Sequence, residues 1–285
     1  MSIATQSYLR FLIIDGYDRP ARQEMAESGA SVAGQLYQKM LQSHRPEAKS
    51  DIIFPADADS ELPAPLESYD AMLWTGSSLT VYDDIPQVTR QIELAREGYK
   101  AGVLAFGSCW ALQIACVAAG GSCRRNPNGR EFGLARKILL TQAGQESPYF
   151  AGRNPVFDGF SSHFDEVESL PTHATILAGN HHTNIQAANI HFDKGQFFAV
   201  QYHPEYDPSE IAGLARFRGG GLIAEGRFEN QSRLSEFINN MNILNDKPKQ
   251  LDIQWLYGID NDVLDVSVRH NEFANWLNLH FGNTR

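Results

Sequence analysis

Long apolar runs are missing from this sequence. None of its 285 residues lies in an unbroken apolar stretch of 18, the length a transmembrane helix needs, so no membrane span is expected. Positive charge is also scarce: 24 Lys and Arg stand against 34 Asp and Glu, a formal net charge of −10. Such a surface repels phosphate backbones. The composition therefore argues against membrane insertion and against nucleic acid as a partner.

Cysteine is sparse as well. The three cysteines, Cys109, Cys116 and Cys123, form no Cys-x-x-Cys pair and no cysteine–histidine spacing typical of zinc. The glycine-rich "RGGGLIAEGR" lacks the lysine and hydroxyl of a phosphate-binding loop. The N-terminal "MSIATQSYLRFLIIDGYD" does not resemble a secretory signal. We therefore expect a cytoplasmic protein with no metal and no cofactor.

Strand and helix patterns alternate through the first half of the chain. Short apolar strands are predicted at "RFLIIDG", "KSDIIFPAD", "ESYDAMLWTGS" and "AGVLAFGS". Helices are predicted from about residue 21 to 43, in "DIPQVTRQIELAREGYKAG" and in "CWALQIACVAAGG". This alternation is typical of an α/β protein with a mostly parallel central sheet covered by helices on both faces.

The second half predicts shorter, partly antiparallel strands that extend the sheet, and the chain becomes polar and helical after about residue 230. We expect a catalytic domain over residues 1–230 and a C-terminal helical extension over residues 231–285. The aromatic residues of this extension are expected to pack its helices onto the domain, or to form a homodimer contact: Trp255, Tyr257, Trp276 and Phe281.

The basic run "RRNPNGR", residues 124–130, is interpreted as a polar loop.

Cys109 follows the strand "VLAF" and begins a helix. A helix N-terminus offers free backbone N–H groups and a partial positive charge, which favour a thiolate nucleophile. The N–H of Trp110 is placed to help stabilise an oxyanion. A structural cysteine fits this turn equally well.

A cysteine nucleophile needs a base, and "FFAVQYHPEYDP" supplies one. His203 follows an apolar strand, and Glu205 is close enough along the chain to orient the imidazole. Gly76, which ends the strand of "AMLWTGSS", is a second candidate for an oxyanion-binding N–H, although a turn glycine explains it too.

Together, "WTGSS", "AFGSCWALQ" and "VQYHPE" resemble the class I glutamine amidotransferase domain. The similarity runs from about residue 10 to 228 and is strongest to stand-alone proteins related to the glutaminase half of GMP synthase. It implies that Cys109 is the nucleophile, His203 the base and acid, and Glu205 the residue that orients His203. It further implies that Gly76 and Trp110 form the oxyanion hole. The substrate would be bound by Gln113, Ser77 and His163.

Two positions depart from the family pattern: Ala111 replaces a glycine, and Trp110 replaces a residue that is often leucine. We expect these changes to reshape the pocket beside the nucleophile.

The sequence leaves three functions open. The first is hydrolysis of γ-glutamyl amides through a γ-glutamyl thioester, which releases glutamate and an amine. The second is a glutaminase subunit that delivers ammonia to a separate synthetase chain. The third is a non-catalytic binding or regulatory module.

Overall fold

The computed structural model describes residues 8–282. Residues 1–7 lie outside this range. They belong to the N-terminal segment that was not expected to be a secretory signal. Across residues 8–282, no helix combines the length and the apolar character that a bilayer crossing requires.

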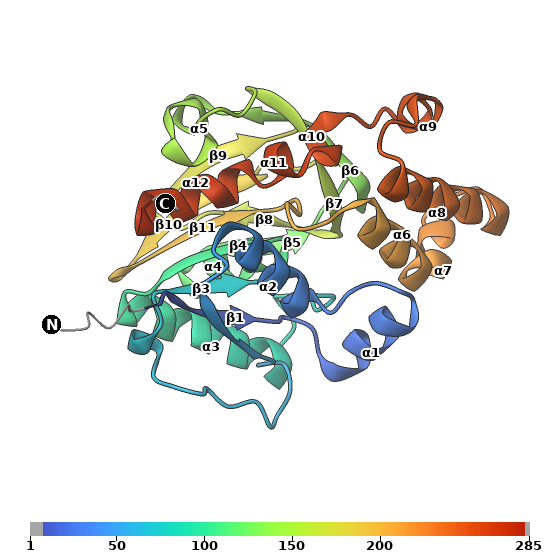
Figure 1. Cartoon of the computed structure of the whole chain (residues 1–285). Helices are drawn as coiled ribbons and strands as arrows, with labels where there is room; N and C mark the ends of the chain where they lie inside the picture. The colour runs from blue at the N-terminus through green and yellow to red at the C-terminus, as the bar shows by residue number, and fades with distance from the viewer. Residues whose placement is uncertain (1–7, 283–285) are drawn as a thin grey trace, which may run out of the picture.

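The described residues form a mixed sheet whose order is β2-β1-β3-β4-β11-β10-β9-β6-β7 (Figure 1). Its first five strands are parallel: β2 (Lys49–Ile53), β1 (Arg10–Ile14), β3 (Ala71–Trp74), β4 (Leu104–Ser108) and β11 (Gly195–Val200). The other four add on in antiparallel fashion: β10 (Ala187–Phe192), β9 (Ala174–Gly179), β6 (Glu131–Leu140) and β7 (Val156–His163). The predicted α/β sheet with an antiparallel extension is confirmed.

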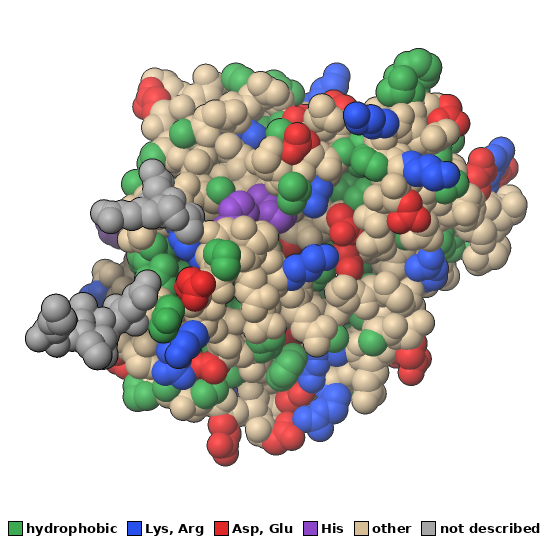
Figure 2. All heavy atoms as spheres, viewed as in Figure 1, with side chains coloured by type: hydrophobic (Ala, Val, Ile, Leu, Met, Phe, Trp, Pro, Cys, Tyr) green, Lys and Arg blue, Asp and Glu red, His purple; other side chains and the backbone are tan. Residues whose placement is uncertain are grey.

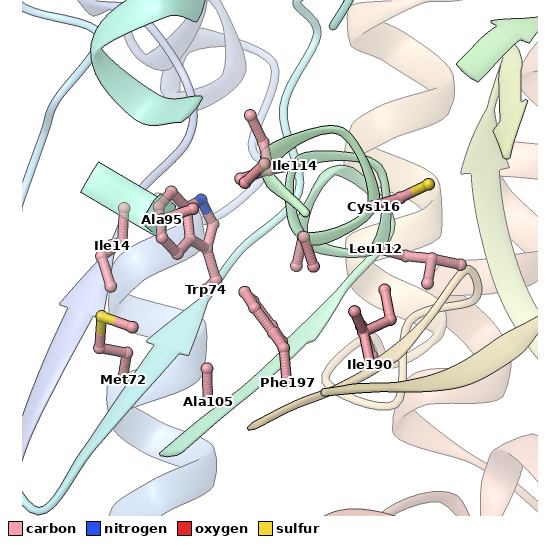
Figure 3. Close-up of a cluster of buried hydrophobic side chains, with 14 of the residues drawn as sticks. Ile14, Met72, Trp74, Ala95, Ala105, Leu112, Ile114, Cys116, Ile190 and Phe197 are labelled. Atoms are coloured by element: carbon pink, nitrogen blue, oxygen red, sulfur yellow. The ribbon is translucent and has the colours of Figure 1, made fainter. Parts of the chain in front are cut away.

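Helices cover both faces of this sheet. On one face, α3 (Pro86–Ala101) and α4 (Trp110–Ala118) bury a large apolar cluster. Figure 3 shows Leu112 of α4 on the side of the strand residue Ile190, whereas Cys116 points away from these strands, with its sulfur 3.2 Å from the carbonyl oxygen of Ser169. Cys116 is fully buried in this apolar cluster.

The opposite face is covered by α2 (Ala33–His44) and by the last helix, α12 (Asn271–Phe281) (Figure 1). Phe273 and Trp276 of α12 pack against Phe106 of β4, with ring centroids 5.0 and 5.7 Å apart. The C-terminal segment therefore supplies part of the core of the sheet. The division into residues 1–230 and 231–285 stays a prediction; α8 begins at Gln231.

The remaining elements surround these layers. A two-stranded sheet pairs β5 (Ser122–Arg125) with β8 (Asp165–Ser169). The other helices are α1 (Arg19–Glu27), α5 (Gln142–Glu146), α6 (Pro208–Phe217), α7 (Gly219–Ala224), α8 (Gln231–Asp246), α9 (Leu251–Tyr257), α10 (Asn261–Leu264) and α11 (Val266–Arg269). Helices α6 and α8 pack together with α1 around a third apolar cluster beside the sheet.

Two details differ from the sequence prediction. The single helix expected from about residue 21 to 43 is two helices, α1 and α2, because Gly29 adopts φ +78° between them. Trp276 packs as expected, but Trp255 of α9 is 76% exposed, so this side chain does not hold the extension onto the domain.

Candidate active site

Three neighbouring parallel strands, β3, β4 and β11, end at the same edge of the sheet. Their register pairs Trp74 with Gly107 and Val200 with Ser108. The residues that follow the three strands are therefore brought together, at the sheet edge where α/β proteins usually bind ligands. In this way the fold gathers Gly76, Cys109 and His203, which lie far apart in the sequence.

Cys109 occupies a strained turn between β4 and α4. Its backbone adopts φ 55° and ψ −102°, which a residue with a Cβ rarely does. The turn is so tight that a Cβ at Gly107 would lie 2.4 Å from the Cβ of Ala111. Only a glycine fits at position 107 without a shift of Ala111 or of the neighbouring strand. The strain at Cys109 is also what a strand–turn–helix that presents a nucleophile requires.

His203 and Glu205 form a buried pair. Nδ1 of His203 lies 2.7 Å from Oε1 of Glu205, and the two side chains are 1% and 3% exposed. The imidazole also stacks on the Tyr206 ring, with centroids 3.9 Å apart and planes 6° from parallel. These contacts fix the ring plane and leave Nε2 as the nitrogen available for a reaction.

The surroundings of His203 favour its protonated form. Burial by itself lowers the pKa of His203, but the Glu205 carboxylate and the Cys109 side chain outweigh it and raise that pKa to about 9. A protonated imidazole beside Cys109 favours the thiolate and can later give its proton to a leaving amine.

Ser108 and Tyr37 extend the hydrogen-bonded pair of His203 and Glu205. Neither of their contacts was predicted from the sequence. The Ser108 hydroxyl donates to Oε1 of Glu205 at 2.8 Å, and the Tyr37 hydroxyl donates to the Ser108 oxygen at 2.7 Å. A serine before the nucleophile does not by itself indicate a contact with Glu205. No local pattern points to Tyr37, because it reaches the site from the face of α2.

The two predicted oxyanion-hole residues flank Cys109. A Cβ added at Gly76 would lie 3.0 Å from Cε1 of His203 and 3.8 Å from the Cβ of Cys109. Trp110 is the first residue of α4, so its N–H is not needed by the hydrogen bonds of the helix. Both backbones are therefore next to the sulfur, and their role in stabilising an oxyanion stays a prediction.

A cavity of about 250 Å³ opens in front of Cys109. Trp110 and all three predicted substrate-binding residues, Ser77, Gln113 and His163, line it. Both ring nitrogens of His163 are already engaged, because Nε2 lies 2.9 Å from Glu131 and Nδ1 lies 2.8 Å from the Asp165 carbonyl. His163 thus forms part of the cavity wall, with both ring nitrogens already bonded to protein groups.

The indole of Trp110 is almost entirely buried. Its Nε1 donates to the Gln91 side chain at 2.8 Å, and its Cδ1 would lie 2.7 Å from a Cβ at Gly16. The indole at the position where the family often has leucine is therefore packed inside the molecule, and Trp110 also contributes to the lining of the cavity.

Charged residues in the cavity were not predicted. Arg125 and Asp165 are directly opposite each other in the β5–β8 pair, and both line the cavity. The guanidinium groups of Arg125 and Arg130 lie over the Phe164 ring, 4.1 and 4.6 Å from its centroid. The signal was the run "RRNPNGR", which was expected to be a polar loop, but its first two arginines belong to β5.

Across the part of the chain that the structure describes, no group of three or more His, Cys, Asp or Glu side chains could hold a metal ion.

Comparison with known proteins gives consistent results. The family model of glutamine amidotransferase class-I matches residues 27–216. The chain is 31% identical over 272 residues to a gamma-glutamyl-L-1-hydroxyisopropylamide hydrolase from a Pseudomonas species, which covers 94% of this chain and 92% of that protein. It is also 29% identical over 134 residues to the glutamine-hydrolysing GMP synthase of Enterobacter sp., covering 46% of this chain and 24% of that protein.

Among solved structures, a glutamine amidotransferase from Thermotoga maritima superimposes with a TM-score of 0.64 at 17% identity, covering 89% of this chain and 99% of that chain. At this identity the likeness concerns the fold.

Proposed function

Because the chain belongs to the class I glutamine amidotransferase family, we propose that it hydrolyses γ-glutamyl amides with Cys109 as the nucleophile. The observation that carries the proposal is the strained Cys109 turn next to the buried His203–Glu205 pair. A hydrolase of this kind needs both a thiolate and a proton donor for the leaving amine, and Cys109 and His203 supply them.

The proposed reaction has two stages. The Cys109 sulfur attacks the γ-carboxamide carbon, and the N–H groups of Gly76 and Trp110 stabilise the oxyanion. His203 gives its proton to the amine nitrogen, the C–N bond breaks, and a γ-glutamyl thioester remains. His203 then takes a proton from water, whose oxygen attacks the thioester. The C–S bond breaks and restores the Cys109 thiolate beside the protonated His203, and glutamate leaves once its γ-carboxyl group has lost a proton to solvent.

The cavity suits the amino-acid head of such a substrate. A γ-glutamyl group carries one carboxylate and one ammonium on its α-carbon. Arg125 and Asp165, opposite each other on β5 and β8, offer one positive and one negative side chain in the same cavity. We assign the α-carboxylate to Arg125 and the α-ammonium to Asp165.

The extent of similarity favours a free-standing hydrolase. The match to the Pseudomonas hydrolase includes the C-terminal segment, whereas the match to GMP synthase spans 46% of this chain. A glutaminase subunit that passes ammonia to a separate synthetase is the second candidate, and the similarity to GMP synthase is what supports it. A homodimer and a cytoplasmic location remain part of the proposal.

A substrate panel tests the proposal. Glutamate release by the purified chain is measured with glutamine and with γ-glutamyl alkyl and aryl amides, with Cys109→Ala as the control. The hydrolase assignment predicts faster turnover of substituted amides than of glutamine. Activity on glutamine alone, or only after a synthetase is added, would support the glutaminase subunit instead. No Cys109-dependent release from any amide would leave a non-catalytic module.

A further inference from the structure

An arginine of the C-terminal segment reaches the loop that carries His203 and Glu205. Arg269, the last residue of α11, donates from Nε to the carbonyl oxygen of Pro204 at 3.2 Å. That carbonyl belongs to the peptide unit that joins Pro204 to Glu205. A hydrogen bond to it therefore restricts the backbone from which the Glu205 side chain extends.

The same guanidinium is anchored on its other side. Nη1 of Arg269 donates to the carbonyl of Val263, in α10, at 2.6 Å. Arg269 thus connects the His203–Glu205 loop to the helices of the C-terminal segment. In Figure 1 these helices lie across the front of the sheet near α2. Figure 2 shows histidine side chains between them and the N-terminal half, consistent with the 3.1 Å contact between His44 and His270.

The charge of Arg269 also faces Glu205. Arg269 and Glu205 both line a cavity of about 170 Å³. Oε1 of Glu205 accepts from His203 and Ser108, while Oε2 is buried and has no hydrogen-bond partner among residues 8–282. A buried carboxylate oxygen without a donor is costly unless a positive charge lies nearby.

Other charged and titratable groups surround Glu205 and Arg269. They come from the nucleophile turn, α2, the His203–Glu205 loop and the C-terminal segment: Cys109, Tyr37, Lys39, His203, Tyr206, Asp207, Asp265 and His270. Burial lowers the pKa of Arg269 from its usual value, against the opposing effect of Asp207, Asp265 and Glu205. An arginine remains charged under these conditions.

We propose that Arg269 is a positioning residue for the reaction proposed above, through which the C-terminal segment orients Glu205 and His203 toward Cys109. The inference rests on the proposed function only in taking Cys109, His203 and Glu205 as partners in one reaction. It goes further in assigning a role in the active site to a segment that lies far along the chain from the three motifs.

The test measures the reactivity of the Cys109 thiol, which needs no knowledge of the substrate. The rate of iodoacetamide alkylation is followed from pH 5 to 10, and the modified Cys109 peptide is quantified by mass spectrometry. The variants are Arg269→Met, which removes charge and donors, and Arg269→Lys, which keeps the charge. Arg136→Met is the matched control, because Arg136 also bonds to carbonyls of the C-terminal segment, those of Tyr257 and Gly258, but does not touch the His203–Glu205 loop.

The Arg269→Met protein is expected to react about 10-fold more slowly at pH 7, and the acid limb of its pH profile should move to higher pH, because a less well oriented Glu205 stabilises the imidazolium less. Arg269→Lys should keep the wild-type acid limb and lose less rate. Arg136→Met should behave as the wild type. Melting temperatures of all variants separate these effects from loss of folding.

Two results would overturn the inference. One is an acid limb and rate for Arg269→Met equal to those of the wild type. The other is an equal loss of rate in Arg269→Met and Arg136→Met that follows their melting temperatures. If Arg269→Met does not fold, Arg269→Lys and Arg269→Gln decide by the same criteria. A wild-type Cys109 with no enhanced reactivity at neutral pH would instead contradict the proposed function.

Discussion

The hydroxyl of Ser108 donates to Oε1 of Glu205 at 2.8 Å, so the residue before the nucleophile holds the carboxylate that pairs with His203. The nucleophile turn and the His203–Glu205 loop, which are separate in the sequence, are thereby joined by one side chain. Ser108 in turn accepts a hydrogen bond from Tyr37 of α2. A buried network of this kind loses more when one member is removed than an exposed contact does.

Replacement of Ser108 by alanine should lower kcat about 10-fold or more, since a hydrogen bond to a charged group is worth about 1.5–3 kcal/mol. KM should stay close to that of the wild type, because Ser108 is buried beneath the cavity. Steady-state kinetics on the best γ-glutamyl amide measure both. Tyr37→Phe should have a smaller effect, and Ser68→Ala, which removes a surface hydroxyl, none. Equal kcat values for Ser108→Ala and Ser68→Ala would contradict the account.

The pH dependence of stability should reflect His203. In the folded protein, burial by itself lowers the pKa of His203. Glu205 and Cys109 outweigh burial and raise that pKa to about 9. An exposed histidine has a pKa of roughly 6.5, so the folded state binds this proton more tightly. The resulting stabilisation is complete below about pH 6.5 and is lost as the pH rises through about 9.

The free energy of unfolding of the wild type should therefore fall between pH 6.5 and 9.5. This fall should exceed the fall in His203→Asn by an amount on the order of 3 kcal/mol. Urea denaturation at both pH values measures the difference. A parallel fall in the two proteins would show that His203 is not protonated at neutral pH.

Gly76 is expected to tolerate no side chain. A Cβ at this position would lie 3.0 Å from Cε1 of His203, so Gly76→Ala should push the imidazole away from Cys109. A displacement of about 1 Å at a reacting group can cost roughly 100-fold in rate, and we expect a loss of kcat approaching that size. Gly220→Ala is the control, because a Cβ there meets no atom within 4 Å. Unchanged kcat in Gly76→Ala would remove the steric argument for this position.

Much of this arrangement could be predicted from local sequence. The strands that precede Gly76, Cys109 and His203 were recognisable from their apolar patterns, and parallel strands bring such ends together. The contacts of Tyr37 and Arg269 were not predictable, because each depends on how a helix distant in sequence packs against the sheet. Gly29 was a visible signal for the break between α1 and α2, but the helical pattern on either side of it concealed the break.

Recognition of the substrate head should depend on Arg125. Removal of its guanidinium by Arg125→Met should raise KM about 10-fold or more and change kcat less, because the α-carboxylate is far from the reacting bond. Arg124→Met is the matched control, since Arg124 pairs with Glu166 and Glu168 and does not line the cavity. A similar KM for the two variants would show that Arg125 does not bind the substrate.

The central claim is that Cys109 carries the γ-glutamyl group during turnover. The most direct measurement is the mass of the Cys109 peptide after acid quenching of the enzyme during turnover of a γ-glutamyl amide, with Cys109→Ser treated in the same way. A γ-glutamyl adduct is expected on Cys109, and it should disappear as the substrate is exhausted. Glutamate release with no adduct on this peptide, and at the same rate in Cys109→Ser, would contradict this claim.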